Sequence, residues 1–200
     1  MQGLSGSPNR WIALFTVSSA IRLYVVHFPP VMVINPLGNS FSYDRVASDY
    51  KGAPWIIRNL VDAVAKGGNF MVGIGPDGNG RFHPTAVRQL LQTGAWLRVN
   101  GSGIYGTRAR GVWKEGDHVR FTVSKDRRYT YAYVLAWPGS RLVLRSVRPR
   151  AGSKIFLLGY GPPLRWTYSP GQLVVFLPYV LQSAAARPCG VAWGFRMEEG

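Results

Sequence analysis

Between residues 54 and 66, hydrophobic residues recur at the spacing of a helix. Pro54 stands where a first helical residue is favoured, and the pair Gly67-Gly68 supplies a stop signal. The apolar positions between them are Ile56, Ile57, Leu60, Val61 and Val64. The sequence therefore predicts an amphipathic helix from about residue 54 to residue 66.

The next apolar run is continuous rather than periodic. Residues 69–74 have the sequence NFMVGI, which is typical of a parallel strand buried on both faces. A glycine-rich turn over residues 75–80 follows, and Pro84 then begins a second predicted helix that ends near Asn100-Gly101. The apolar positions expected on one face of this helix are Val87, Leu90, Leu91 and Leu97.

From residue 108 onward the pattern changes to short segments rich in β-branched and aromatic residues, separated by turn signals such as Pro138-Gly139 and Pro170-Gly171. The predicted strands are 119–123, 129–137, 142–147, 154–158, 173–177 and 192–197. Strands at this spacing predict an antiparallel β-sandwich. The expected fold class is α+β, with a helix–strand–helix piece in front of the sandwich.

Residues 1–36 carry no clear period. The stretch from Trp11 to Ile34 is apolar enough to resemble a membrane span, but Arg22 and His27 interrupt it and Pro29-Pro30 break it. It also begins too late for an ordinary signal peptide. We assign this stretch to neither class.

The chain has 24 basic and 9 acidic residues and a formal charge of +15, which suggests nucleic acid, an acidic surface or an acidic glycan as a partner. Between Arg108 and Lys154, however, the basic residues fall singly or in pairs among apolar ones, as solvated positions on strands do. Nucleic acid is therefore not the expected partner, although a basic nucleic-acid adapter stays open as an alternative.

The few residues suited to metal binding or disulfide formation do not form a recognisable site. Cys189 is the one cysteine, so an internal disulfide is excluded. His27, His83 and His118 lie far apart in sequence. We expect neither a metal nor a cofactor.

The most specific motif is KGGNFMVGIGPDGNGRF, residues 66–82, in which Gly-Gly-Asn leads into an apolar strand, an Ile-Gly-Pro segment and an Asp-Gly turn. Further segments lie before and after it in a fixed order. They are Ser40-Phe41-Ser42-Tyr43, Leu60-Val61-Asp62, Gly94-Ala95-Trp96-Leu97, Asn100-Gly101, Ile104-Tyr105-Gly106-Thr107, Leu135-Ala136-Trp137-Pro138 and Leu158-Gly159. This series resembles the α-L-fucosidase family of retaining glycoside hydrolases over about residues 37–197.

The resemblance implies the end of a (β/α)8-like barrel followed by a β-sandwich. Residues 1–36 would be an unmatched segment, 37–107 the end of the barrel and 108–200 the sandwich. The implied activity is hydrolysis of terminal α-L-fucose from glycoconjugates, without a cofactor. Fucosylated glycans would be the partners, no membrane would be bound, the location would be lysosomal or secreted, and the full-length family would form homo-oligomers. Gly75, Pro76 and Asp77 would lie near the rim of the site.

Three departures from the family pattern stand out. The family's asparagine within the strand is Gly73, and its glutamate after Asn-Gly is Ser102, which makes Asn100 a candidate glycosylation site. The family's nucleophilic aspartate and sugar-binding histidines belong upstream, where residues 1–36 match nothing. We therefore expect a C-terminal fragment with a foreign or mis-spliced front, with no catalytic residue and no activity of its own.

Phe41 is the candidate substrate-binding residue. The resemblance implies an aromatic wall against the C6 methyl group of fucose, while ordinary core packing stays open as the alternative. Asp77 is expected to stabilise a turn, because aspartate in Pro-Asp-Gly can bond local backbone.

The positions of the other aromatic residues can be interpreted in two ways. Trp55, Trp96 and Trp113 are expected in the core or at a domain interface. Tyr129, Tyr131, Tyr133 and Trp137 are expected in the sheet core, with a sugar platform as the alternative. Carbohydrate binding or support of the barrel by the sandwich alone is the second functional hypothesis.

Overall fold

The computed structural model describes residues 11–12, 25–26 and 31–200. A short antiparallel pair, β1 (Trp11–Ile12) and β2 (Val25–Val26), comes first. The apolar stretch considered above as a membrane span lies largely outside the described residues. Within the described part of the chain, no helix is both long and apolar enough to cross a membrane.

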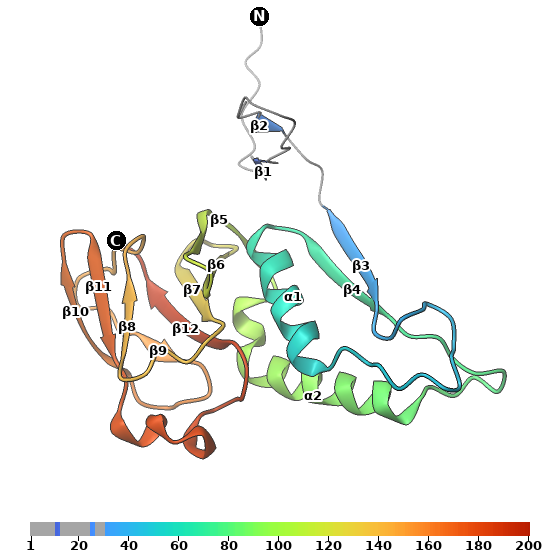
Figure 1. The fold of residues 1–200 in the computed structure, drawn as a ribbon. Coiled ribbons are helices and arrows are strands. Elements are labelled where there is room, and N and C mark those ends of the chain that lie inside the picture. The colour runs from blue at the N-terminus through green and yellow to red at the C-terminus, as the bar shows by residue number, and fades with distance from the viewer. Residues whose placement is uncertain (1–10, 13–24, 27–30) are drawn as a thin grey trace, which may run out of the picture.

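The first part of the fold is a parallel strand pair joined through a helix. Strand β3 (Met32–Pro36) pairs in parallel with β4 (Asn69–Gly73), and α1 (Ala53–Ala65) lies between them in sequence. The sequence analysis missed β3, because five residues just after Pro29-Pro30 show no period of their own. Figure 1 shows α1 and α2 (Pro84–Asn100) between this strand pair and the antiparallel sheets.

Helix α1 confirms its prediction. Pro54 is in its first turn, and Ile56, Ile57 and Val61 are buried at the expected spacing. The helix stops at Lys66, and the amides of Gly67 and Gly68 then donate to the carbonyls of Val64 and Ala63, each at 2.8 Å. These bonds satisfy carbonyls that the end of a helix leaves without a partner.

Two expectations about burial were wrong. Strand β4 is not buried on both faces: Met71 is 46% exposed, because only the opposite face, with Phe70 and Val72, packs against a helical core. In α2, Val87 and Leu91 are exposed at 37% and 68%. The buried positions of α2 are Ala86, Thr93, Trp96 and Asn100.

The second part of the fold consists of two antiparallel sheets, as expected for residues 109–197. The five-stranded sheet has the order β5-β6-β7-β12-β9, and the three-stranded sheet has the order β10-β11-β8. Their bounds are β5 (Thr107–Glu115), β6 (Val119–Ser124), β7 (Tyr129–Val134), β8 (Arg141–Leu144), β9 (Phe156–Leu157), β10 (Arg165–Ser169), β11 (Gln172–Phe176) and β12 (Trp193–Glu198). Short 3-10 helices lie at Gly101–Gly103, Tyr179–Gln182 and Ala184–Ala186. The sequence analysis did not single out β5 or β10.

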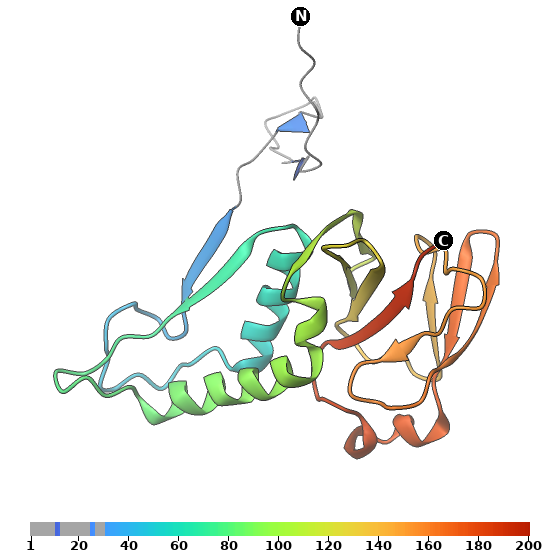
Figure 2. The same ribbon diagram turned by 180° about the vertical axis from the view of Figure 1, so that it is seen from behind.

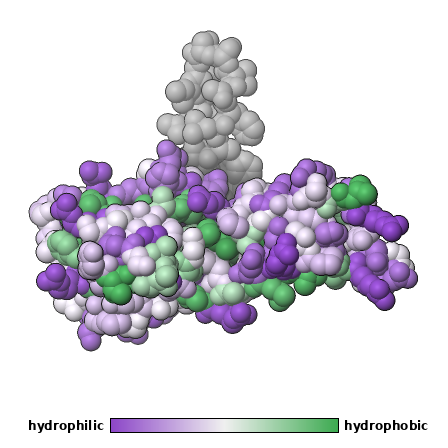
Figure 3. Space-filling view, turned by 60° about the horizontal axis from the view of Figure 1, so that its bottom comes forward, coloured by the Kyte–Doolittle hydropathy of each residue, from purple (hydrophilic) through white to green (hydrophobic). Residues whose placement is uncertain are grey.

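The two antiparallel sheets share one apolar core. Phe121, Val134 and Phe195 from the five-stranded sheet pack in the same cluster as Leu144 and Leu173 from the three-stranded sheet. At 25–30 cal/mol per Å² of buried apolar surface, a cluster of this kind is the main stabilising contribution of the β part. The face of the molecule in Figure 3 mixes hydrophobic and hydrophilic residues.

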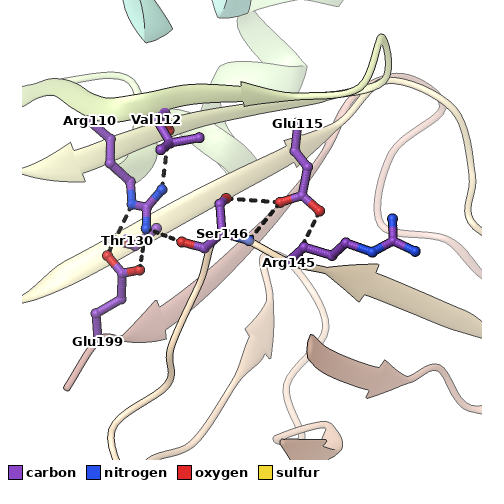
Figure 4. Close-up of polar contacts among 7 residues, drawn as sticks. All are labelled: Arg110, Val112, Glu115, Thr130, Arg145, Ser146 and Glu199. Carbon is purple, nitrogen blue, oxygen red and sulfur yellow. Dashed lines mark hydrogen bonds and ion pairs between the residues drawn. The ribbon is translucent and has the colours of Figure 1, made fainter. Parts of the chain in front are cut away.

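A polar cluster ties β5 to the chain that follows β8 (Figure 4). Arg110 on β5 donates to both carboxylate oxygens of Glu199, at 3.1 and 2.7 Å, and to the carbonyl of Ser146. At the end of β5, the Glu115 carboxylate accepts the backbone amides of Arg145 and Ser146, at 2.6 and 3.1 Å. The Arg110 guanidinium and the Glu115 carboxylate therefore connect the five-stranded sheet to the chain after β8, while Glu199 holds Arg110 in place.

Candidate functional site

The carboxyl ends of β3 and β4 lie at the same edge of the parallel pair. The loops that follow them, residues 37–50 and 74–83, lie at the end of the helices far from the antiparallel sheets (Figures 1 and 2). In α/β folds, ligands bind beyond the carboxyl ends of parallel strands. This edge is therefore the candidate site.

The loop after β3 is fastened to the strand ends by backbone bonds and one lysine. Leu37 is fully buried, and its amide donates to the carbonyl of Gly73 at 2.9 Å. Lys51 donates through its backbone amide to Leu37 and through Nζ to the carbonyls of Pro36 and Gly38, each at 2.7 Å. Charge-assisted bonds of this length hold the chain rigidly as it leaves β3.

Phe41 lies over the end of β4. A Cβ on Gly73 would stand 2.7 Å from Cδ1 of Phe41, and one on Gly75 would stand 2.3 Å from the backbone nitrogen of Tyr43. Gly75 is thus required for the close backbone crossing of residues 41–43, while Gly73 leaves room for the Phe41 ring. Phe41 is 56% exposed, so it is not a buried core residue.

A small hollow beneath this loop is lined by Gly38, Tyr43, Tyr50, Gly75 and His83, among others. Its volume of about 20 Å³ admits roughly one water molecule and no sugar ring. This hollow alone therefore cannot hold a monosaccharide.

One wall of the hollow is a stacked pair of rings. The rings of Tyr50 and His83 lie with centroids 5.0 Å apart. Burial raises the pKa of the Tyr50 phenol, and Tyr43 and Asp44 raise it further. His83 has a structural role, because its Nδ1 accepts the amide of Thr85 at 3.2 Å and caps α2.

The acids beside the site stabilise turns. Asp77 Oδ1 accepts the amides of Asn79 and Arg81 at 2.9 and 2.8 Å, which confirms its turn prediction. Asp44 accepts the amide of Val46 in the same manner, at 3.0 Å. At this edge of the described residues, both carboxylates bond backbone amides and neither is paired with another carboxyl group.

The remaining acids lie elsewhere except for Asp49, which is in the loop after β3, and all nine acids of the chain are among the described residues. Asp62, Glu198 and Glu199 form ion pairs with arginine or lysine. Asp49, Glu115 and Asp126 accept hydrogen bonds from serine hydroxyls. Asp117 is exposed in the turn between β5 and β6. Their contacts make them supports for the fold.

Comparison with known proteins extends over both parts of the chain. A family model described as α-L-fucosidase matches residues 28–102, and one described as the α-L-fucosidase C-terminal domain matches residues 114–198. The chain belongs to the α-L-fucosidase family. The match to the fucosidase model begins at residue 28 and includes β3, so the similarity starts earlier than the sequence analysis expected.

Curated fucosidases of several animals are similar to this chain. The α-L-fucosidase of Branchiostoma floridae is 32% identical over 178 residues, covering 84% of this chain and 37% of the relative. The tissue α-L-fucosidase of Bos taurus is 34% identical over 158 residues, covering 77% and 33%. The chain thus spans about a third of the length of these relatives.

Solved fucosidase structures share the fold. Isoenzyme 1 of the Paenibacillus thiaminolyticus α-L-fucosidase has a TM-score of 0.74 at 24% identity, covering 86% of this chain and 40% of that one. The Thermotoga maritima α-fucosidase in complex with fucose has a TM-score of 0.70 at 25% identity, covering 83% and 39%. The mixed α/β architecture with antiparallel sheets is therefore a fucosidase fold.

In this member of the fucosidase family, two tyrosines of β7 are buried where the five-stranded sheet packs against the helices. Tyr131 and Tyr133 are 5% and 0% exposed, and Tyr133 donates its hydroxyl to the carbonyl of Asn100 at 2.6 Å. The core prediction is therefore correct for Tyr131 and Tyr133, which cannot offer a sugar platform, whereas Tyr129 and Trp137 are only partly buried. Trp96 donates to the carbonyls of Val191 and Ala192 at 2.7 and 3.0 Å, as an interface residue does.

The other two tryptophans also follow the expectation of core or interface positions. Trp55 packs edge-on against Phe70, with ring centroids 5.8 Å apart. Trp113 lies between Lys66 at the end of α1 and Arg120 on β6, at 5.0 and 5.4 Å from its ring. It therefore sits where the helical and antiparallel parts meet.

Asn100 is fully buried, and its side chain is used inside the fold. Its amide group donates to the carbonyl of Trp96 at 3.3 Å, and its Oδ1 accepts the amide of Gly194 at 3.2 Å. A glycan on this nitrogen has no room in the folded chain. The sequon-based expectation for Asn100 is therefore corrected: a sequence motif carries no information about burial.

Proposed function

We propose that this chain supplies the C-terminal part of an α-L-fucosidase that hydrolyses terminal α-L-fucose from glycoconjugates. The observation that carries the proposal is the match to both fucosidase models together with Phe41 at the carboxyl ends of the parallel strands. Relatives named plasma and tissue α-L-fucosidase support a secreted or lysosomal location.

In this proposal β3 and β4, with α1 and α2, are the closing strands and helices of a (β/α)8-like barrel. Residues 31–34 support it: Val31, Met32, Val33 and Ile34 are 48%, 51%, 39% and 50% exposed. Barrel strands normally have hydrogen-bonded neighbours on both sides and covered apolar faces. Further strands from outside the described residues would cover this apolar edge.

Phe41 would form the apolar wall against the C6 methyl group of fucose. Its ring is more than half exposed and lies at the strand ends, where barrel enzymes bind their substrates. The hollow beside it holds about one water, so the rest of the barrel must complete the pocket.

A retaining glycosidase needs two carboxyl groups about 5 to 5.5 Å apart, one as nucleophile and one as acid and base. Asp44 and Asp77 beside Phe41 stabilise turns, and most of the others form ion pairs or hydrogen bonds that support the fold. We propose that both catalytic carboxyls come from outside the described residues and that this chain alone does not hydrolyse fucosides.

The antiparallel part would be a β-sandwich that supports the barrel. Its contacts favour support over an independent carbohydrate-binding role. Tyr133 binds the end of α2, and Arg120 on β6 forms an ion pair with Asp62 on α1 at 2.6 Å. Tyr131 and Tyr133, two of the aromatics that could have formed a sugar platform, are buried at this interface.

A chimaera tests the proposed function. The matching C-terminal part of the bovine tissue α-L-fucosidase would be replaced by residues 31–200, and hydrolysis of an aryl α-L-fucoside would be measured. Restored hydrolysis supports the proposal, with the bovine enzyme lacking its C-terminal part as the inactive control. A folded chimaera that neither binds nor cleaves the fucoside would contradict the proposal.

A further inference from the structure

The face of the five-stranded sheet that is turned away from the three-stranded sheet carries a guanidinium between two aromatic rings, beside the part of this face that packs on the helices. Arg196 on β12 lies 5.0 Å from the ring centroid of Tyr129 on β7 and 5.1 Å from that of Phe156 on β9. Arg196 lies in register opposite Tyr131 on β7 and Phe156 on β9, and its neighbours Phe195 and Met197 are fully buried in the core between the two antiparallel sheets. The three side chains are half-buried and lie on the other face of the sheet, where Tyr129 packs at the edge of the core shared with the helices.

Two more arginines extend this surface. Arg128 also stacks on Tyr129, at 5.0 Å, and Arg128 and Arg150 each approach Glu198 at 3.5 Å. Their side chains are 63% and 70% exposed. We call these six residues the arginine–aromatic surface: Arg128, Tyr129, Arg150, Phe156, Arg196 and Glu198.

The surface has an excess of positive charge with free donors. It contains three guanidinium groups and one carboxylate, that of Glu198, whose ion pairs with Arg128 and Arg150 are both long contacts at 3.5 Å. Arg196 has no carboxylate partner among the described residues. A guanidinium carries five N–H donors in a planar fork, so most of this donor capacity is directed to solvent.

Planar forks of this kind bind sulfate and carboxylate groups through paired hydrogen bonds. Rings fixed on strands beside them supply apolar area against which the carbon face of a sugar can lie. We propose that the arginine–aromatic surface binds an anionic glycan, a saccharide chain bearing sulfate or carboxylate groups. The preference for anions rests on the arginines, and the choice of a glycan over nucleic acid rests on the proposed function.

The test uses the purified 200-residue chain and measures binding, so it is independent of hydrolysis. The probes are dextran sulfate, polygalacturonate as the carboxylated polymer, and unsulfated dextran, titrated near physiological salt to screen distant charges. The surface variant is Arg128→Gln with Arg196→Gln. The matched control is Arg141→Gln with Arg165→Gln, which removes the same charge from exposed positions of the three-stranded sheet.

The surface variant should lose about tenfold or more in affinity for at least one of the two anionic polymers, since it lacks two of the three guanidinium groups that would donate charge-assisted hydrogen bonds. The control should lose only a fewfold, and unsulfated dextran should bind neither protein. Equal losses in both variants would mean that net charge alone causes binding, and would overturn the proposal. If the surface variant is less folded by circular dichroism, Arg128→Gln with Arg150→Gln replaces it, because both of those side chains are mostly exposed.

A second variant should change the affinity in the opposite direction. Glu198→Gln releases Arg128 and Arg150 from their carboxylate, so binding of the anionic polymer should tighten severalfold. Asp117→Asn, an exposed acid with the same charge change, is the control and should have a smaller effect. Unchanged or weaker binding by Glu198→Gln would count against the surface. A single-stranded oligonucleotide that binds more tightly than either polymer, and through the same arginines, would overturn the glycan assignment.

Discussion

The ring of Phe41 lies against the backbone of Gly73, the last residue of β4. A Cβ at Gly73 would be 2.7 Å from Cδ1 of Phe41 and 3.0 Å from Cε1, which is closer than such atoms approach in proteins. The family pattern has asparagine at this position. In this chain, the missing side chain is what allows the Phe41 ring to lie over the strand.

Gly73→Asn should therefore move the Phe41 ring. We expect a change in its ring proton chemical shifts, with a cost in unfolding free energy below about 1 kcal/mol, because the ring is already 56% exposed and can turn toward solvent. Gly78→Asn is the matched control, since nothing lies within 4 Å of its Cβ position. Unaltered ring shifts in Gly73→Asn would show that the contact is not made in solution.

Phe41→Ala in the bovine chimaera should weaken the binding of fucose more than the binding of arabinose, which lacks the C6 methyl group. The expected difference is about 1 to 2 kcal/mol, from the loss of one buried methyl contact and the cavity left behind. Inhibition constants of the two free sugars against aryl fucoside hydrolysis would measure it. Equal losses for both sugars would assign Phe41 to packing alone.

Residue types and their spacing along the chain were enough to predict much of the fold. Pro54 and Gly67-Gly68 fix the ends of α1, and the β-branched and aromatic runs fix most of the antiparallel strands. Burial was harder to predict. Leu91 has the residue type of a core position, yet it is 68% exposed, because α2 packs through Trp96 and Asn100 against residues nearly a hundred positions away.

The candidate site was predictable only in outline. Phe41 was singled out by resemblance, but its crossing over Gly73 depends on the path of a loop that no local pattern specifies. Likewise, the sequon at Asn100 is a local motif, whereas the partner of its side chain is Gly194, far along the chain. Contacts between distant segments decide both cases.

The ion pair between Asp62 and Arg120 should stabilise the contact between the helices and the antiparallel sheets. Burial by itself raises the pKa of Asp62, but hydrogen bonds and charge from Lys66 and Arg120 outweigh it, so the pKa is lowered overall. A lowered folded-state pKa gives stability that is present above the unfolded value of about 3.9 and is lost as the pH falls through the folded value.

Asp62→Asn should therefore cost about 1 to 2 kcal/mol of unfolding free energy at pH 7 and much less at pH 3. Urea denaturation at both pH values would measure the difference between wild type and variant. Asp117→Asn, an exposed acid in a turn, serves as the control. A difference that stays the same from pH 7 to pH 3 would show that the ion pair does not contribute.

Asn100 should carry no glycan in the folded protein. Its side chain is fully buried and bonded to Trp96 and Gly194. When the chain is secreted from a glycosylating host, we expect the protein to have the same mass before and after endoglycosidase treatment. The Ser102→Ala variant, which removes the sequon at an exposed position, should have the same yield and melting temperature. Folded protein with a glycan on Asn100 would contradict the burial.

The most direct test of the central claim is the hydrolysis of an aryl α-L-fucoside by the purified 200-residue chain. The acids beside Phe41 hold turns, and removing a nucleophile from a hydrolase costs several orders of magnitude in turnover. We therefore expect release of the aryl group at the rate of the buffer blank, while the chimaera with residues 31–200 is active. Hydrolysis by the chain alone that an iminocyclitol inhibitor abolishes would contradict this account, because two of its nine acids would then have to form a catalytic pair.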